Sequence, residues 1–269
     1  MLLTLGIILV VLMVVVGGDR GVGSVLALIA NMAIMFFAIK LISMGVNPYL
    51  IVFLASLLFV SVTLIYQNET NMKSLSSVIA VMIVMIVLSC FIAVVVNKTR
   101  IAGYSEVDRY EEITMYVSTN ISVKMDQVMI CVVLLGLLGA IMDTSIAITT
   151  AVYEIHRNNP HFNRKQLVRS GRNVGKDIMG TTVNTLLLAT IGETIMLNVL
   201  YLKFHYTFAQ LLNSKSFFQE FCMIVFSNIG CLLIIPISYS VISYLLVSDS
   251  KVAVWFRQYC AKKEAEEDV

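Results

Sequence analysis

The chain has 269 residues, of which 58% are hydrophobic and only 13% are charged, and its formal net charge is +2. Soluble domains carry about 25% charged residues, so this composition excludes an ordinary water-soluble core and indicates a protein embedded in a bilayer. No basic patch of the kind that binds nucleic acid is present. The five cysteines and three histidines show no metal-ligand spacing, so we expect neither a metal site nor a cofactor.

Seven segments are apolar enough to cross a bilayer, which takes about 20 residues of helix. The sequence therefore predicts an all-α, polytopic transmembrane helix bundle over residues 1–247 and a cytoplasmic tail over 248–269. The first segment is short, but it lacks the basic start of a cleaved signal peptide. The predicted spans lie near residues 1–16, 24–45, 49–66, 78–96, 127–153, 178–202 and 221–247.

The basic residues of the loops predict the orientation of the spans, because Lys and Arg accumulate on the cytoplasmic side. The loops 17–23, 67–77 and 154–177, together with the tail, hold 12 Lys and Arg, whereas the loops of the opposite side hold 6. We therefore expect the N-terminus outside and the C-terminus in the cytoplasm. The longest outer loop, 97–126, is expected to contain one amphipathic helix.

An acidic residue, Asp143, stands near the middle of the predicted span 127–153. An ionised group at that depth costs about 2.5–3.5 kcal/mol on insertion scales, so it is usually functional or paired. Small residues share its side of the helix and would let another helix approach closely. These predicted packing residues are Gly136, Gly139 and Ala140.

The next predicted span, 178–202, begins with a second polar stripe that we expect to face Asp143. The stripe comprises Asp177, Thr181, Asn184 and Thr185, and Gly180 is expected to ease the helix entry. A rise of about 1.5 Å per residue puts Asn184 or Thr185 within reach of Asp143 if the helices tilt. Two interpretations remain open: Asp143 binds and releases a proton or cation, or its hydrogen bonds only fix helix packing.

Two further features concern charged residues at or near the membrane. Lys40 and Glu193 lie at similar predicted depth and form a candidate ion pair, unless Lys40 reaches outward and Glu193 faces water. The basic segment 154–177 is expected to hold a helix that begins near Arg164, is capped by Asn163, and lies along the inner surface.

The two polar segments carry a resemblance to a known family. LLGAIMDTSIAITTAVYEI and SGRNVGKDIMGTTVNTLLLATIG resemble the signature of the bacterial YibE/F family, a G-A-x-M-D helix followed by an S-G-x-x-x-G-x-D-I-M-G-T-x-x-N-T-L block. The matching residues are Gly139, Ala140, Met142 and Asp143, then Ser170, Gly171, Gly175, Asp177, Ile178, Met179, Gly180, Thr181, Asn184, Thr185 and Leu186.

The resemblance implies a multi-pass protein of the bacterial plasma membrane. Many members carry an extracytoplasmic domain after their first span, so this chain resembles the short member of a split pair, with a second YibE/F-type subunit or a second copy as partner besides the lipid bilayer. A fainter similarity links it to the membrane half of resistance–nodulation–division transporters, although the single Asp143 and the missing outer domain depart from that pattern.

These observations favour a transport or ion-coupling subunit in which Asp143 titrates. The alternative is a non-transporting membrane scaffold or receptor subunit whose polar core only sets helix packing. An enzyme is not expected, because no metalloprotease, Ser/Lys or GxGD-type motif is present.

Overall fold

The structure, a computed structural model, describes residues 1–66, 71–99, 103 and 124–267. All regular structure in this part of the chain is helical, which confirms the predicted all-α class. Six of the described helices are long and apolar enough to cross a membrane. The amphipathic helix expected in the outer loop falls on residues 100–123, which, apart from Gly103, lie outside the described residues.

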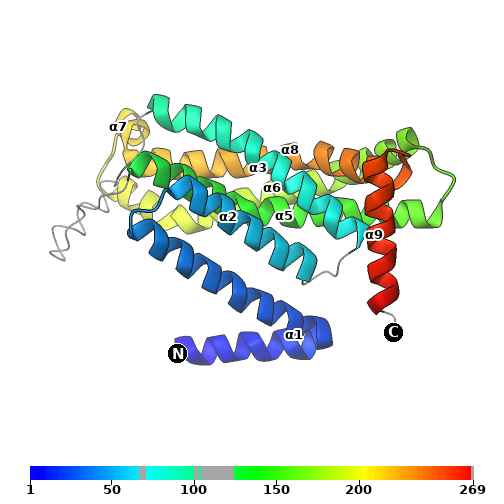
Figure 1. The fold of residues 1–269 in the computed structure, drawn as a ribbon. Coiled ribbons are helices and arrows are strands. Elements are labelled where there is room, and N and C mark those ends of the chain that lie inside the picture. Colours follow the sequence, from blue (N-terminus) through cyan, green and yellow to red (C-terminus); the bar gives the residue numbers. More distant parts are fainter. Residues whose placement is uncertain (67–70, 100–102, 104–123, 268–269) are drawn as a thin grey trace.

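The first helix, α1 (Leu2–Ser43), contains the first two predicted spans. Its path reverses at Gly18, whose φ of 56° lies in the left-handed region that glycine adopts easily. The two arms of α1 therefore run in opposite directions (Figure 1). A Cβ on Gly21 would overlap the backbone carbonyl of Met13, so the close return also requires glycine. The six long helices thus contain about seven spans.

The remaining long helices cover the other predicted spans, and several extend beyond the predicted ends. Asn47 caps α2 by accepting a hydrogen bond from the backbone N–H of Tyr49, and Pro48 occupies the first turn, where proline is favoured. The elements after α1 are α2 (Pro48–Val60), a π-helix η1 (Ser61–Tyr66), α3 (Met72–Thr99), α5 (Met125–Asn158), α6 (Arg164–Lys203), α7 (Phe208–Asn213), α8 (Lys215–Val247) and α9 (Lys251–Glu267).

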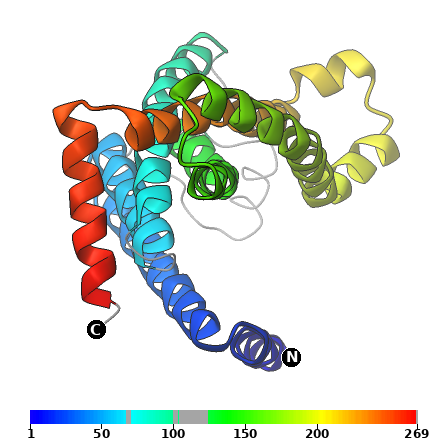
Figure 2. The same ribbon diagram turned by 90° about the vertical axis from the view of Figure 1, so that its right-hand side faces the viewer.

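Helix α5 is the centre of the bundle. Among the spanning helices it is the most enclosed, since 61% of its most apolar window is buried against 6% for α6. Its core residues Leu137, Ile141 and Ile148 are fully buried, and it packs against α2, α3, α6 and α8. Figure 2, a view nearly along the helices, shows α5 inside this group and the N-terminal arm of α1 apart from it.

Helix α6 begins at the predicted cap but continues farther than expected. Asn163 accepts a hydrogen bond from the backbone N–H of Gln166, and the Gln166 side chain accepts one from the backbone N–H of Asn163. The helix then runs without a break to Lys203. The prediction of a separate helix along the inner surface is therefore wrong, because the basic segment forms the first turns of the span itself.

Two glycines let α6 approach α8 near the predicted cytoplasmic end. A Cβ on Gly171 would lie 2.5 Å from Cβ of Tyr239 and 2.9 Å from Cγ2 of Val152 on α5. A Cβ on Gly175 would lie 2.5 Å from Cγ2 of Ile235. Helices with small residues at such crossings pack by close van der Waals contact, the main attraction between helices in lipid.

The tail forms α9, which crosses the end of the bundle at a steep angle (Figure 1). Arg257 anchors it by donating hydrogen bonds to the carbonyl oxygens of Leu246 (3.1 Å) and Ser248 (2.5 Å) at the end of α8. Trp255 remains 58% exposed on α9, as is common for aromatic residues at a membrane interface.

We predict that Gly171→Ala destabilises the protein, because the added methyl group must displace Tyr239 or Val152. Overpacking of this kind costs about 1–3 kcal/mol. Gly192→Ala, on the same helix, is the matched control, since nothing lies within 4 Å of its added Cβ. Thermal unfolding in detergent should give a lower midpoint for Gly171→Ala alone; equal midpoints would show that the crossing is not close.

Candidate functional site

Asp143 lies on the one stripe of α5 that the chain leaves open. From Val132 to Ala147 the exposed positions on this helix recur every three or four residues and alternate with buried ones, and the next exposed position, Glu154, follows seven residues later. The exposed residues of this stripe are Val132, Gly136, Gly139, Asp143, Ala147 and Glu154. The stripe that sequence periodicity grouped together is therefore a continuous surface, with Asp143 near its middle.

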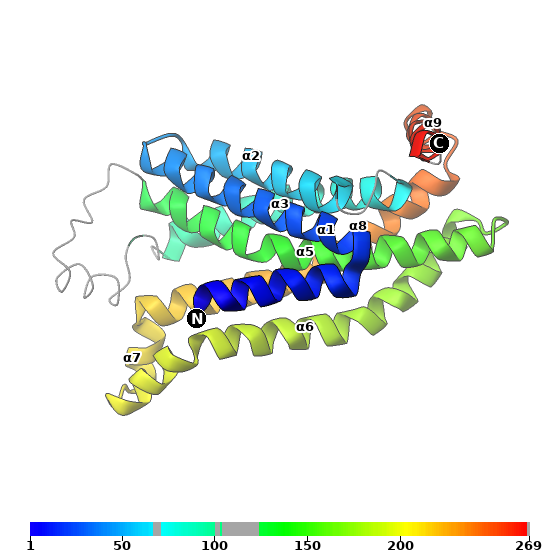
Figure 3. The same cartoon turned by 90° about the horizontal axis from the view of Figure 1, so that it is seen from below.

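The stripe does not pack against α6 as predicted. An added Cβ on Gly139 would meet nothing within 4 Å, and one on Gly136 would meet only the Met223 side chain, at 3.0 Å. Gly180 on α6 is equally open. Seen from below, α5 and α6 are close near the loop that joins them and diverge toward their other ends (Figure 3).

The predicted contact of Asp143 with Asn184 or Thr185 is absent: no hydrogen bond in the described part of the chain joins them, and all three are exposed. The reason is the rotation of α6. Gly175 faces α8, and Asp177, two residues later, lies about 200° farther round the helix. Asp177, Thr181, Asn184 and Thr185 consequently lie on the exposed side of α6.

The candidate pair of Lys40 and Glu193 is also not formed. Both residues are exposed, and the ion pair that joins described residues is instead Arg257 with Asp249, at 3.9 Å. Glu193 interacts electrostatically with Glu220 of α8, a like charge. Similar depth along two helices does not make them neighbours, and α1 packs on α2 and η1.

The opposite side of α5 carries a set of buried hydroxyl groups that the sequence did not reveal as a site. The side chains of Ser145 and Ser238 on α8 are 2.9 Å apart, and those of Thr149 and Ser77 on α3 are 2.6 Å apart. All four residues are fully buried. These pairs join α5 to α3 and α8, so the helix is polar on its packed side as well as at Asp143.

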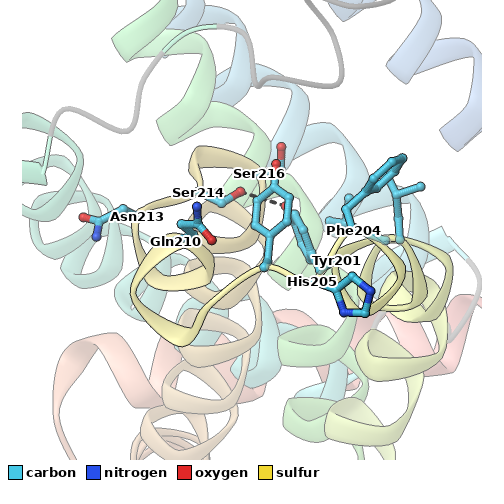
Figure 4. Close-up of a pocket in the computed structure, with 10 residues that line it drawn as sticks. Tyr201, Phe204, His205, Gln210, Asn213, Ser214 and Ser216 are labelled. Carbon is cyan, nitrogen blue, oxygen red and sulfur yellow. Dashed lines mark hydrogen bonds between the residues drawn. The ribbon is translucent and has the colours of Figure 1, made fainter.

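A cavity of about 1050 Å³ lies where α6, α7 and α8 meet, at the predicted outer end (Figure 4). Its walls include Tyr201, Phe204 and Tyr206, and the rings of Tyr201 and Tyr206 are 5.0 Å apart. The hydroxyl groups of Tyr201 and Ser214 are 2.8 Å apart and share a hydrogen bond. This cavity is apart from Asp143, and the predicted polar residues do not line it.

Comparison with protein-family models identifies the chain. The model of the YibE/F-like protein matches residues 5–248. The chain belongs to the YibE/F-like protein family. With its six long apolar helices, this YibE/F-like protein is a multi-pass membrane protein. Neither the curated proteins nor the solved structures contain a match to it.

The described part of this YibE/F-like protein contains no cluster of side chains that could bind a metal ion. No three His, Cys, Asp or Glu side chains there lie close enough together to hold an ion. The accessible residues of the predicted polar site, Asp143, Asp177, Thr181, Asn184 and Thr185, carry carboxylate, amide and hydroxyl groups, whose chemistry suits hydrogen bonding or weak cation binding.

We predict that the hydroxyl pair of Ser145 and Ser238 stabilises the YibE/F-like protein. Ser145→Ala should lower stability, because it leaves the Ser238 hydroxyl buried without this partner. The pair should show a coupling of about 0.5–1.5 kcal/mol, the range for hydrogen bonds between membrane helices. A double-mutant cycle with Ser238→Ala, measured by unfolding in mixed micelles, tests this; strictly additive effects would contradict it.

Proposed function

We propose that this YibE/F-like protein is a transport or ion-coupling subunit of a bacterial plasma-membrane complex, and that Asp143 is the group that binds and releases the proton or cation. The observation that carries the proposal is the position of Asp143. It is an exposed carboxylate on the only open stripe of the most enclosed helix.

The lack of hydrogen bonds to Asp143 in the described part of the chain favours this role over one in packing alone. Within the described residues its carboxylate makes neither a hydrogen bond nor an ion pair, whereas Ser145, two residues later, has a partner on α8. A carboxylate that serves packing needs donors to offset the loss of hydration. An accessible carboxylate without fixed donors can instead exchange a proton or a cation.

The small residues around Asp143 supply room for that exchange. Gly139 and Ala147 flank the carboxylate on the open stripe, and neither fills the space beside it. Water or a cation can therefore reach the carboxylate if a partner subunit shields the stripe from lipid. The proposal therefore includes a second YibE/F-type subunit or a further copy of the chain, which would cover the stripe.

The alternative is a scaffold or receptor subunit that transports nothing. Its support is the buried hydroxyl set on α5, which fixes α5 against α3 and α8 without any movable group. In that case Asp143 would receive its hydrogen bonds from the partner and would serve assembly. The two functions differ in what neutralising the carboxylate does to ion flux.

We predict that Asp143→Asn abolishes proton or cation flux in vesicles that contain the protein with its co-purified partner. The amide keeps the size of the side chain but cannot exchange a proton or carry charge. Asp126→Asn is the matched control, because Asp126 is exposed in the first turn of the same helix and should leave flux unchanged. Flux is followed with an internal pH dye or a cation-sensitive dye.

Each outcome of the flux measurement is decisive. Flux in the wild type and in Asp126→Asn, with only the empty-vesicle background in Asp143→Asn, supports the proposal. Equal flux in all three removes Asp143 from the mechanism. The absence of flux in the wild type, in vesicles shown to hold the assembled complex, favours the scaffold.

A further inference from the structure

The exposed side of α6 carries a regular seam along the span. Its residues follow each other at alternating steps of four and three, the spacing of a and d positions in a helix that packs lengthwise on another helix. Every member is exposed in this chain, and α6 has the least buried window of the spanning helices. The seam residues are Asp177, Thr181, Asn184, Leu188, Ile191 and Ile195.

The first half of this seam is polar, and two of its members, Thr181 and Asn184, fall inside the predicted span 178–202, where lipid offers no hydrogen bonds. In the described chain neither Asn184 nor Asp177 has a side-chain hydrogen bond, and Asp177 has no ion pair. Thr181 donates only to the carbonyl oxygen of Ile178 in its own helix, at 2.9 Å. Unsatisfied amide groups in hydrocarbon cost several kcal/mol, so protein must cover this face.

The residues of the seam are suited to pack against the same residues of a second copy of the chain. In two copies with the same orientation, equal residues lie at equal depth, and an Asn or Thr side chain both donates and accepts hydrogen bonds. By these steps Thr181 occupies an a position and Asn184 a d position, so in a parallel pair each of these polar side chains meets its own counterpart. In such a pair the two Asp177 carboxylates face each other at the end of the seam, and the exposed Lys176 next to each of them supplies a cation that offsets their repulsion.

We propose that α6 is the interface between two copies of this chain, packed in parallel about a two-fold axis normal to the membrane, with Asn184 paired to Asn184 of the second copy. Leu188, Ile191 and Ile195 continue the contact toward the outer side. The interface assigns a partner to the polar residues of α6, and it rests on the proposed function only for the membrane setting, not for ion movement.

Cysteine cross-linking in native membranes tests the interface with a matched pair of neighbouring leucines. Leu188 is on the seam and Leu187 beside it, and both are exposed, at 60% and 41%. Each is changed to Cys in a chain whose exposed Cys90 is replaced by Ser; the other four cysteines are buried. Under mild oxidation Leu188→Cys should give a disulfide-linked product of twice the chain mass, and Leu187→Cys only background.

A third variant tests Asn184. Adding Asn184→Leu to Leu188→Cys should lower the cross-linking yield, because the pair then loses the hydrogen bond between the two Asn184 side chains. An unchanged yield removes Asn184 from the contact. The dimer is overturned by equal cross-linking at 187 and 188, by none at 188, or by a product whose mass shows a different protein. None of these results alters the flux of Asp143→Asn, so the dimer and the ion coupling can fail independently.

Discussion

The lack of hydrogen-bonding solvent in a bilayer is the constraint on which this structure depends. Every polar side chain along the spans must find its partner within its own helix, on a neighbouring helix, or on another chain. Helix α5 shows the second solution at Ser145 and Thr149, whose hydroxyls pair with those of α8 and α3. Among the described residues, Asp143, Asp177 and Asn184 have neither of the first two solutions, and all three lie on the surface of the single chain.

The glycines of α6 decide where its polar residues lie. Gly171 and Gly175 bring α6 against α8, and this contact fixes the rotation of the whole helix. Asp177 and Asn184 are then turned away from the bundle, since one helix cannot present Gly175 to α8 and Asp177 to α5 near the same crossing. The two polar segments of the sequence thus lie on different surfaces. The segment on α5 carries the exposed carboxylate of Asp143, and the segment on α6 carries the seam.

The sequence predicted what depends on local pattern and missed what depends on helix rotation. The spans, the reversal before residue 24 and the Asn163 cap follow from runs of apolar residues and from short-range hydrogen bonding. Counting residues gave Lys40 and Glu193 similar depth, but depth says nothing about which helices are neighbours or which sides they present. Ser145 and Thr149 were missed because Ser and Thr in helices often bond their own backbone, as Thr149 also does to the Ser145 carbonyl at 3.0 Å.

The Asp143 stripe of α5 and the seam of α6 together bear on whether Asp143 serves ion coupling or helix packing. If α6 pairs with α6 of a second copy, the amides and hydroxyls of that seam are used, and they cannot also be the donors that a packing role for Asp143 requires. The donors must then come from a different subunit or from water. The stripe residues nearest to Asp143 are Gly136, Gly139 and Ala147, which leave space and supply no side-chain donor of their own. The carboxylate therefore has no fixed donor in the described part of the chain, and the proposal of ion coupling rests on this feature.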